Sequence, residues 1–161
     1  MSVRVRPARP DDSSFIELLG LATALDTVSP VRTVSQRAAE AAFHRLLAFC
    51  NDRPGMVSLV AERAETPAGF LIMLTDVPDE VTQERQAFVA YVAVREADRG
   101  HGVGRALMRA AMAEGRKRDL PFISLMVSAG NASARALYES EHFMNERVLM
   151  SRPLESLGPR R

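Results

Sequence analysis

A glycine-rich hexapeptide stands between the most apolar run of the chain and its longest helical pattern: Arg99-Gly100-His101-Gly102-Val103-Gly104. The run before it, Phe88 to Val94, is apolar on both faces, which is typical of a central strand that helices cover on each side. The segment after it, Gly102 to Arg118, repeats apolar residues at helical spacing. A buried strand, a glycine turn and a long helix in this order predict an α/β fold built around one sheet.

Further strands and helices are predicted from hydrophobic periodicity and from capping residues. The strands are Val3 to Arg6, Met56 to Glu62, Gly69 to Thr75, Phe122 to Val127 and Glu146 to Arg152. The first predicted helix is capped by Asp11 or Asp12, and its apolar face consists of Phe15, Leu18, Leu19, Ala22 and Leu25. A second helix is capped by Ser35 and ends near Cys50. A shorter helix runs from Ser133 to about Glu141. The turn composition of Glu65 to Gly69 predicts an antiparallel hairpin. The order is β-α-α-β-β-β-α-β-α-β, and because strands outnumber the crossovers of a parallel sheet, the sheet should be mixed.

The chain has 161 residues and a formal net charge of +1. This length is near that of one domain, so we expect a single domain over residues 1–161, with a frayed tail at 155–161. Arginines are spread along the chain among acidic residues, with few aromatic residues between them, whereas nucleic-acid binders concentrate basic residues on one face. The composition therefore argues against a nucleic-acid partner.

Cysteine usage and the opening residues bear on location. Cys50 is the only cysteine, so an intrachain disulfide cannot form and a reducing compartment is favoured. Its place in an apolar helical stripe indicates a core residue rather than a nucleophile. The opening MSVRVRPARP carries charge but no apolar signal region, and no stretch has the length to cross a bilayer. We expect a cytoplasmic protein with no membrane partner.

The glycine hexapeptide is suited to holding an anion. A helix start presents unpaired N–H groups and the positive end of the helix dipole, and glycines let a phosphate approach the main chain. A Walker A loop would need Lys and Ser or Thr where Arg105 and Ala106 stand, and the dinucleotide fingerprint would need a glycine at Arg105. Taken alone, the loop is also compatible with a tight turn that binds nothing, although the anion site is favoured.

The loop and the strand before it resemble motif A of the GNAT superfamily of N-acetyltransferases. That motif, Arg/Gln-x-x-Gly-x-Gly/Ala after a strand that ends in V-x-V, is matched by Arg99, Gly102 and Gly104 after Val92-Ala93-Val94. The opening VRVRPARPDD is similar to the family's first strand and helix cap. The resemblance therefore covers the chain to about residue 154.

A second motif strengthens the resemblance. The N-x-x-A-x-x-L-Y pattern of motif B is matched by Asn131, Ala134, Leu137 and Tyr138. One departure is His142, because a glycine commonly precedes the family phenylalanine that Phe143 matches.

The resemblance implies a mixed, mostly antiparallel sheet of six to seven strands flanked by about four helices. It also implies acetyl-CoA as the cosubstrate and no metal. In the family the loop amides bind the CoA pyrophosphate, and the strand end pairs its backbone with the pantetheine amides. The implied cofactor-binding residues are Val92, Ala93, Val94, Arg99, Gly100, His101, Gly102, Val103, Gly104, Arg105, Asn131, Ser133, Arg135 and Tyr138. Arg105 or Arg109 would face phosphates from the first turns of the helix.

The implied reaction is transfer of an acetyl group to a primary amine by direct attack in a ternary complex. A backbone N–H near Val92 would supply the oxyanion dipole, and Tyr138 would act as general acid to the leaving thiolate. A free phenol has a pKa of about 10 and a thiol about 8.5, so a tyrosine is protonated at neutral pH. Without the two motifs, Asn131 and Tyr138 also fit a turn residue and a packing aromatic.

The general base that the resemblance implies is missing from the central strand. Family members often carry a glutamate on the central strand, but Phe88 to Val94 contains no acid. Glu62 and Glu84 are substitutes, although a charged strand face and a solvated loop explain them equally well. The missing acid supports an alternative function, a non-catalytic acyl-CoA-binding or sensing module. The three histidines lie at positions 44, 101 and 142, without metal-ligand spacing, so no metal is expected.

In the family the acceptor site is built by three regions, which here are Asp26 to Thr33, Asp76 to Glu84 and Asn145 to Ser151. The middle region holds four acids that would attract a cationic amine, or that form a solvated acidic loop: Asp76, Asp79, Glu80 and Glu84. Small amines and protein amines are both compatible with the resemblance as acceptors, because the fold alone does not determine the substrate. A homodimer, through the final strand or the early helices, is compatible with the resemblance.

Overall fold

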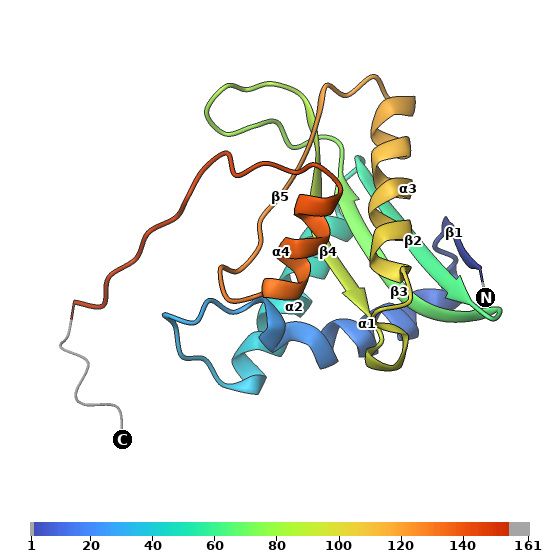
Figure 1. Cartoon of the computed structure of the whole chain (residues 1–161), viewed down its shortest axis with the longest axis horizontal. Helices are drawn as coiled ribbons and strands as arrows, with labels where there is room; N and C mark the ends of the chain where they lie inside the picture. Colours follow the sequence, from blue (N-terminus) through green and yellow to red (C-terminus); the bar gives the residue numbers. More distant parts are fainter. Residues whose placement is uncertain (1, 155–161) are drawn as a thin grey trace.

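Five strands form one mixed sheet in the order β1-β2-β3-β4-β5 in the computed structural model, which describes residues 2–154 (Figure 1). The strands are β1 (Val3–Pro7), β2 (Met56–Arg63), β3 (Thr66–Leu74), β4 (Gln86–Val94) and β5 (Phe122–Leu125). Neighbouring strands run antiparallel except β4 and β5, which are parallel. The mixed, mostly antiparallel sheet is thus confirmed, whereas the predicted frayed tail at 155–161 lies outside the described residues.

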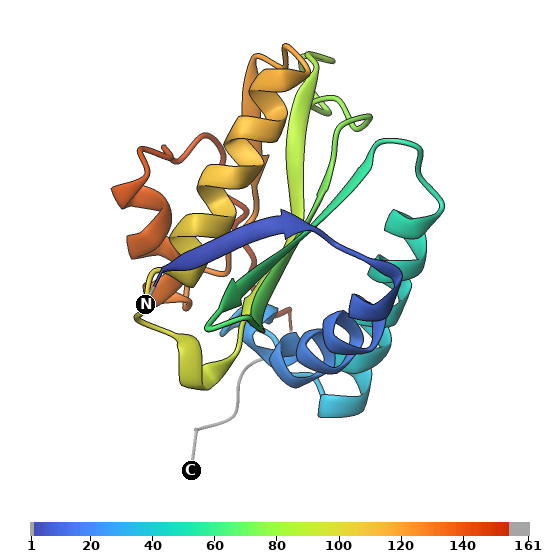
Figure 2. The same ribbon diagram turned by 90° about the vertical axis from the view of Figure 1, so that its right-hand side faces the viewer.

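Helices cover both faces of the sheet. They are α1 (Ser13–Thr23), α2 (Gln36–Asn51), α3 (Val103–Lys117) and α4 (Ala132–Ser140), with short 3-10 helices at Pro10–Asp12, Ala24–Thr27 and Glu96–Asp98. Figure 2 shows α3 and α4 on one side of the sheet and α1 and α2 on the other. Across the described part of the chain, no helix combines the length and apolar character needed to span a membrane.

Strand β4 contributes to both hydrophobic cores because its pairing with β3 is interrupted. Ala87 and Val89 pack in the core under α3, whereas Tyr91 and Ala93 pack in the core under α1 and α2. Two strand residues separated by two normally share a face. Here the register shifts, with Ile72 opposite Tyr91 and Met73 opposite Val89, so that Ala90 is one extra residue in β4. This bulge turns the second half of the strand over.

The hairpin between β2 and β3 is tighter than predicted. Ala64 and Glu65 both have positive φ, 51° and 59°, as a two-residue hairpin turn requires. Strand β3 begins at Thr66, so the predicted turn from Glu65 to Gly69 is wrong over most of its length. Gly69 instead lets β3 pack closely against β4 and α3, since a Cβ there would lie 2.7 Å from the carbonyl oxygen of Ala93.

The buried face of α1 also differs from the predicted stripe. Leu18 is 68% exposed and Leu25 is 42% exposed. The buried residues are Ile16, Leu19, Gly20 and Thr23. Gly20 is the reason, because a Cβ at this position would lie 1.9 Å from the Phe43 ring. The close approach of α2 at this glycine rotates α1 away from the apolar stripe that the sequence suggests.

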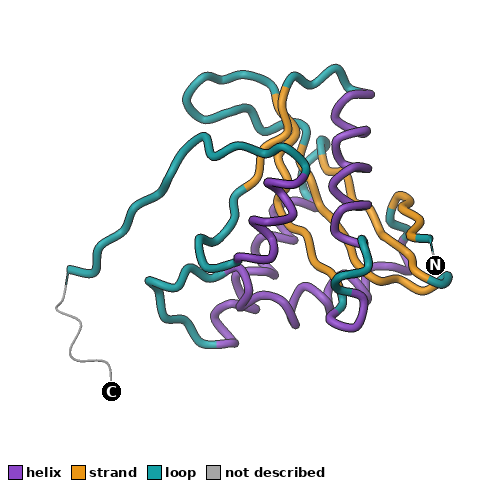
Figure 3. Tube along the Cα trace, in the orientation of Figure 1, coloured by secondary structure: helices purple, strands orange, loops and turns teal. Residues whose placement is uncertain are grey.

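The predicted last strand, Glu146 to Arg152, is wrong, and within residues 2–154 the sheet has five strands rather than six to seven. Residues 144–154 form an exposed loop that leaves the domain after α4 (Figure 3). The predicted buried strand from Phe122 to Val127 is shorter, β5, and lies at the sheet edge with Phe122 56% exposed. The sequence pattern records strand propensity, but a strand forms only where a partner edge is within reach.

A partly buried ion network ties β1 to the entry of α1. The Arg6 guanidinium donates from Nη1 to Asp12 Oδ2 and from Nε to Glu62 Oε1, both at 2.6 Å. The side chains of Arg6 and Asp12 are only 10% and 7% exposed. The hydrogen bond from Arg6 lowers the pKa of the Asp12 carboxyl despite its burial. This carboxylate therefore stabilises the fold above about pH 4, and its contribution is lost as the pH falls toward the lowered folded-state pKa.

Asp12→Asn is expected to lower the free energy of unfolding by about 2 kcal/mol at pH 7, because it removes the charge from two hydrogen bonds to Arg6. Urea denaturation at pH 7 and pH 3 checks this, and the deficit should shrink at the lower pH. Asp11→Asn is the matched control, since Asp11 is the neighbouring residue and its side chain is exposed. Equal stability of the two variants at pH 7 would contradict the role of the network.

Candidate functional site

Strands β4 and β5 separate at the end of the sheet that carries the glycine loop. Their parallel pairing runs from Gln86 opposite Phe122 to Val89 opposite Leu125, where β5 ends. Strand β4 continues to Val94, so Val92, Ala93 and Val94 have no β5 partner among the described residues. The bulge at Ala90 marks the same point of the strand. An extended ligand carrying amides can pair with this free backbone edge as an added strand does.

The glycine loop follows directly and has the backbone conformation that only glycine adopts easily. Gly100 and Gly102 have φ of +76° and +81°, and a Cβ on either would meet nothing within 4 Å. The glycines are therefore required by conformation, and the space above them is open. Gly102 is the N-cap of α3, and within the described residues this helix start has no side-chain capping hydrogen bond. Its first N–H groups, which include those of Val103, Gly104 and Arg105, face this space, and a diphosphate fits such a helix start.

A buried carboxylate braces the turn before the loop. Asp98 is 5% exposed and accepts hydrogen bonds from Arg63 Nη1 at 3.0 Å and from Arg95 Nε at 2.8 Å. The bond from Arg95, followed by the one from Arg63, lowers the pKa of the Asp98 carboxyl. The brace fixes the chain direction immediately before Arg99.

Two side chains of the loop are already engaged. Arg99 donates from Nε to the Val94 carbonyl and from Nη2 to the Asp26 carboxylate, both at 3.2 Å. His101 is exposed, and its Nδ1 lies 2.9 Å from the Arg99 carbonyl oxygen. Both side chains are thus engaged within the protein, which leaves the backbone amides of the loop as its free polar groups.

Helices α3 and α4 meet beside the loop. Gly104 allows this contact, because a Cβ there would lie 3.1 Å from Leu137 Cδ2. Arg105 and Arg109 of α3 both bind Glu141 at the end of α4, each through Nε at 2.9 Å. They were expected to face phosphates, but their guanidinium groups lie against α4 instead. The hydrogen bond from Arg109 lowers the pKa of the Glu141 carboxyl.

The sequence carries no local signal for the role of Glu141. Its partner Arg109 is 32 residues away in the chain, so no local pattern reveals the pair.

The residues of motif B lie at the start of α4 and along it, and α4 packs into the same hydrophobic core as α3. Asn131 is the N-cap of this helix, with Oδ1 accepting from the Ala134 amide at 3.1 Å. Ser133 is exposed, and Arg135 is half-buried with Nη1 3.4 Å from the Ala129 carbonyl oxygen. Tyr138 is the buried residue of the helix, 8% exposed. Burial alone raises the pKa of its phenol, so the hydroxyl stays protonated well above neutral pH.

The end of α4 fixes the Tyr138 ring. The Phe143 amide donates to the Tyr138 carbonyl and the His142 amide donates to the Glu139 carbonyl, both at 3.0 Å. These two bonds are the Schellman arrangement, which is usually accompanied by an apolar contact. Here the rings of Tyr138 and Phe143 supply it, with centroids 5.9 Å apart. His142 occupies the left-handed position with φ of 66°. The departure from the family glycine therefore leaves the turn intact.

His142→Gly is expected to raise the free energy of unfolding by about 1 kcal/mol, because glycine adopts positive φ without the penalty that a Cβ brings. Chemical denaturation measures the gain. His142→Ala is the matched control, since it removes the imidazole but keeps the Cβ and should give no such gain. A stabilisation of equal size in both variants would assign the effect to the ring instead of the backbone.

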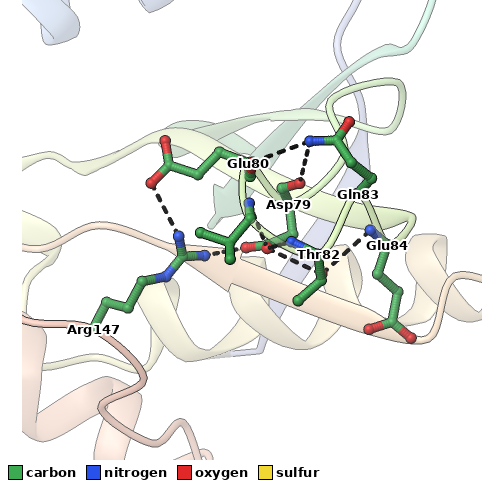
Figure 4. A network of polar contacts seen from close by, with 7 residues as sticks. Asp79, Glu80, Thr82, Gln83, Glu84 and Arg147 are labelled. Atoms are coloured by element: carbon green, nitrogen blue, oxygen red, sulfur yellow. Dashed lines mark hydrogen bonds and ion pairs between the residues drawn. The ribbon is translucent and has the colours of Figure 1, made fainter.

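The three regions that resemblance assigns to an acceptor lie together. Arg147 binds the carboxylates of Asp79 and Glu80, which joins the C-terminal segment to the loop between β3 and β4 (Figure 4). Arg32 Nη2 lies 3.4 Å from the Ser151 hydroxyl, which joins the same segment to the loop after α1. The pKa of Asp79 is lowered, first by the Thr82 amide and less by Arg147. Part of the acidic character of this loop is thus already balanced within the protein.

The two candidate general bases, Glu62 and Glu84, do not lie at the glycine loop. Glu62 lies in β2 and binds Arg6, two strands from β4. Glu84 is exposed in the loop before β4. His44 lies on α2, 3.6 Å from Glu17, whereas His101 precedes α3 and His142 follows α4. Within residues 2–154, no group of three or more His, Cys, Asp or Glu side chains is arranged to hold a metal ion. Cys50 is fully buried on α2, as expected of a core residue.

Comparison with known proteins identifies relatives of the whole fold. A model described as "Acetyltransferase (GNAT) family" matches residues 21–143. A search of curated proteins gives no significant match. A Pyrococcus furiosus structure assigned as an acetyl transferase has a TM-score of 0.79 at 19% identity, covering 95% of this chain and 100% of that one. An Agrobacterium tumefaciens structure, also assigned as an acetyltransferase, has a TM-score of 0.63 at 28% identity, with 93% and 99% covered.

A third similar structure contains a ligand. AAC(6')-Iy, solved with the bisubstrate analog CoA-S-monomethyl-acetylneamine, has a TM-score of 0.64 at 18% identity, with 95% of this chain and 99% of that chain covered. At this identity, and at that of the Pyrococcus furiosus structure, the likeness shows the fold alone.

Proposed function

This chain belongs to the acetyltransferase (GNAT) family, and from that membership we propose that it transfers the acetyl group of acetyl-CoA to a primary amine by direct attack in a ternary complex. The observation that carries the proposal is a juxtaposition at one end of the sheet. The free β4 edge at Val92 and Val94, the start of α3 at Val103 after two left-handed glycines, and the buried Tyr138 of the next helix all contribute to one hydrophobic core.

The donor site would be made chiefly of backbone. The free edge of Val92 to Val94 suits the amides of a pantetheine arm, and the amides of residues 100–105 suit its diphosphate. Bound acetyl-CoA supplies an activated thioester. The CoA-containing analog bound by AAC(6')-Iy supports the same ligand class here. A backbone N–H near Val92 would stabilise the developing oxyanion.

Tyr138 would supply the proton that the departing sulfur requires. Burial raises the pKa of its phenol, and Phe143 packs against its ring, so a protonated hydroxyl is held at one place. A positioned donor of this kind stabilises negative charge as it builds on sulfur. No carboxylate of β4 serves as base, so the amine would lose its proton to water or arrive neutral.

A free-thiol assay with acetyl-CoA and propionyl-CoA over a panel of amines and peptides tests this function. Thiol release that requires an acceptor, with initial-rate plots that intersect, is expected for a ternary complex. The missing carboxylate on β4 favours one other function, a module that binds acyl-CoA without turnover. Thermal stabilisation by acetyl-CoA, with no thiol release over the whole panel, would establish that module and overturn catalysis.

A further inference from the structure

One ion pair joins the glycine loop to the segment that follows α1. Arg99 Nη2 lies 3.2 Å from Oδ2 of Asp26, which belongs to the 3-10 helix Ala24–Thr27. Arg99 belongs to the loop that would hold the diphosphate, whereas Asp26 begins the first of the three regions that resemblance assigns to the acceptor. The two side chains are 52% and 55% exposed. The pair therefore connects the donor and acceptor halves of the proposed site through groups that a ligand can reach.

Arg99 also occupies part of the strand edge that a pantetheine arm would use. Its Nε donates to the Val94 carbonyl at 3.2 Å. The Arg95 amide donates to the Ala68 carbonyl beside β3, and neighbouring residues of a strand direct their backbone groups to opposite edges. The Val94 carbonyl therefore faces away from β3, on the free edge. An added strand that pairs at Val94 would compete with Arg99 for this acceptor.

Binding of the donor should therefore release Arg99 from Asp26. A diphosphate at the amides of residues 100–105 brings negative charge next to Arg99, and an arginine binds a phosphate through two parallel hydrogen bonds. An ion pair between exposed side chains contributes little to stability in water, so a diphosphate can displace the Asp26 carboxylate.

Asp26 differs in this respect from other acids of the acceptor regions. Asp79 is bound by Arg147 of the C-terminal segment. Asp76 is bound by Arg53, which follows α2. Both of these arginines lie outside the glycine loop, so a donor bound there leaves their ion pairs in place.

The charge of Asp26 also reaches the middle of β4. Burial raises the pKa of the Tyr91 phenol, the hydrogen bond with Thr23 lowers it, and the negative charge of Asp26 raises it further. Tyr91 directly precedes Val92, near which a backbone N–H would stabilise the oxyanion. A carboxylate released by Arg99 would thus attract a cation toward the part of the strand where the thioester is expected.

We propose that Asp26 binds the ammonium group of the acceptor, and that Arg99 occupies this carboxylate until acetyl-CoA is bound. A primary amine of the lysine type has a pKa of about 10.4, so it arrives protonated at neutral pH. The substrate class is then a primary amine in its cationic form, which binds first and afterwards loses its proton to water. The inference rests on the proposed function, because it assigns the acceptor half of the same site.

Calorimetry with CoA tests the release of Asp26 without turnover. Asp26→Asn is expected to tighten CoA binding about threefold, because Arg99 no longer has to leave a carboxylate. Glu96→Gln is the matched control, since it removes the same charge from an exposed residue three positions before Arg99 and should change the affinity less than about 1.5-fold. In an Arg99→Ala background Asp26→Asn should have no effect, because the two substitutions remove one contact. Equal tightening by Asp26→Asn and Glu96→Gln would overturn the competition.

The acceptor role of Asp26 is measured by KM and kcat separately, with the amine of the panel that is acetylated fastest. Asp26→Asn is expected to raise the KM of this amine about tenfold and to change kcat less than about threefold, because it removes a charged partner of the bound amine. Asp26→Glu, which keeps the carboxylate, should return KM to within about threefold of the wild-type value. An unchanged KM in Asp26→Asn would contradict the assignment.

Thermal unfolding with CoA and the same amines separates this inference from the proposed catalysis. In the wild type the amines should stabilise the CoA complex more than the CoA-free protein, and Asp26→Asn should remove that difference. Such stabilisation without thiol release would overturn catalysis and support the Asp26 site. An equal shift in the wild type and in Asp26→Asn, or no shift in either, would overturn the Asp26 site whether or not thiol is released.

Discussion

Tyr138→Phe is expected to lower kcat about 100-fold while the dissociation constant of acetyl-CoA changes by less than about threefold. The phenylalanine keeps the ring that packs against Phe143 and removes only the proton donor. Because burial raises the pKa of the phenol, the wild-type hydroxyl is protonated at neutral pH, and the substitution removes that proton. Initial rates of thiol release measure kcat, and calorimetry with acetyl-CoA measures binding.

The chain offers a matched control, since it has only two tyrosines. Tyr91 is buried to the same extent as Tyr138, but its hydroxyl contacts Thr23 at 3.1 Å and donates to the Gly20 carbonyl at 3.2 Å. Tyr91→Phe should therefore lower the free energy of unfolding by about 1 kcal/mol and leave kcat nearly unchanged. If both variants retained the wild-type rate, Tyr138 would have no part in the chemistry.

The double variant Gly100→Ala/Gly102→Ala is expected to weaken CoA binding about 100-fold. Each alanine would have to adopt the positive φ of the loop at a cost of about 1 to 2 kcal/mol or change its conformation, which would redirect the amides at the start of α3. A factor of ten in affinity corresponds to about 1.4 kcal/mol, so two such penalties account for a loss of this size. Isothermal titration with CoA measures it without turnover.

Gly115→Ala is the control for this loss, because it adds the same methyl group to the same helix. Gly115 lies inside α3, and a Cβ there would make an ordinary contact of 3.7 Å with Ala87. It should leave CoA affinity intact and stabilise the fold by about 0.5 to 1 kcal/mol, since alanine is the better helix former. Wild-type affinity in the double variant would remove the loop from the donor site.

Features of the site that depend on local signals could be predicted from the sequence. The glycine loop was predicted because it lies between an apolar strand and a helical pattern, and the structure places it at the start of α3. The Ser35 cap was predicted because its hydroxyl accepts from an amide only three residues away. The position of Tyr138 on one face of a short helix follows from helical spacing alone.

Features that depend on distant partners could not be predicted. The bulge at Ala90 leaves no trace in β4, because every residue from Ala87 to Val94 is apolar or aromatic and alternation cannot reveal a change of face. The arginines of α3 were expected at phosphates, since nothing near them in the chain announces Glu141. The last strand was predicted from composition, but composition does not state whether a partner edge lies within one molecule.

The extra residue in β4 divides the strand between two layers of the molecule. A change in side-chain volume at Val89 should displace α3 and, with it, the glycine loop at the start of that helix. A change at Tyr91 should instead displace α1 and the loop that follows it. Substitutions only two positions apart should therefore perturb opposite sides of the domain. Substitutions in β4 should therefore alter the side that would bind the donor and the side that would bind the acceptor independently, although one continuous strand supports both.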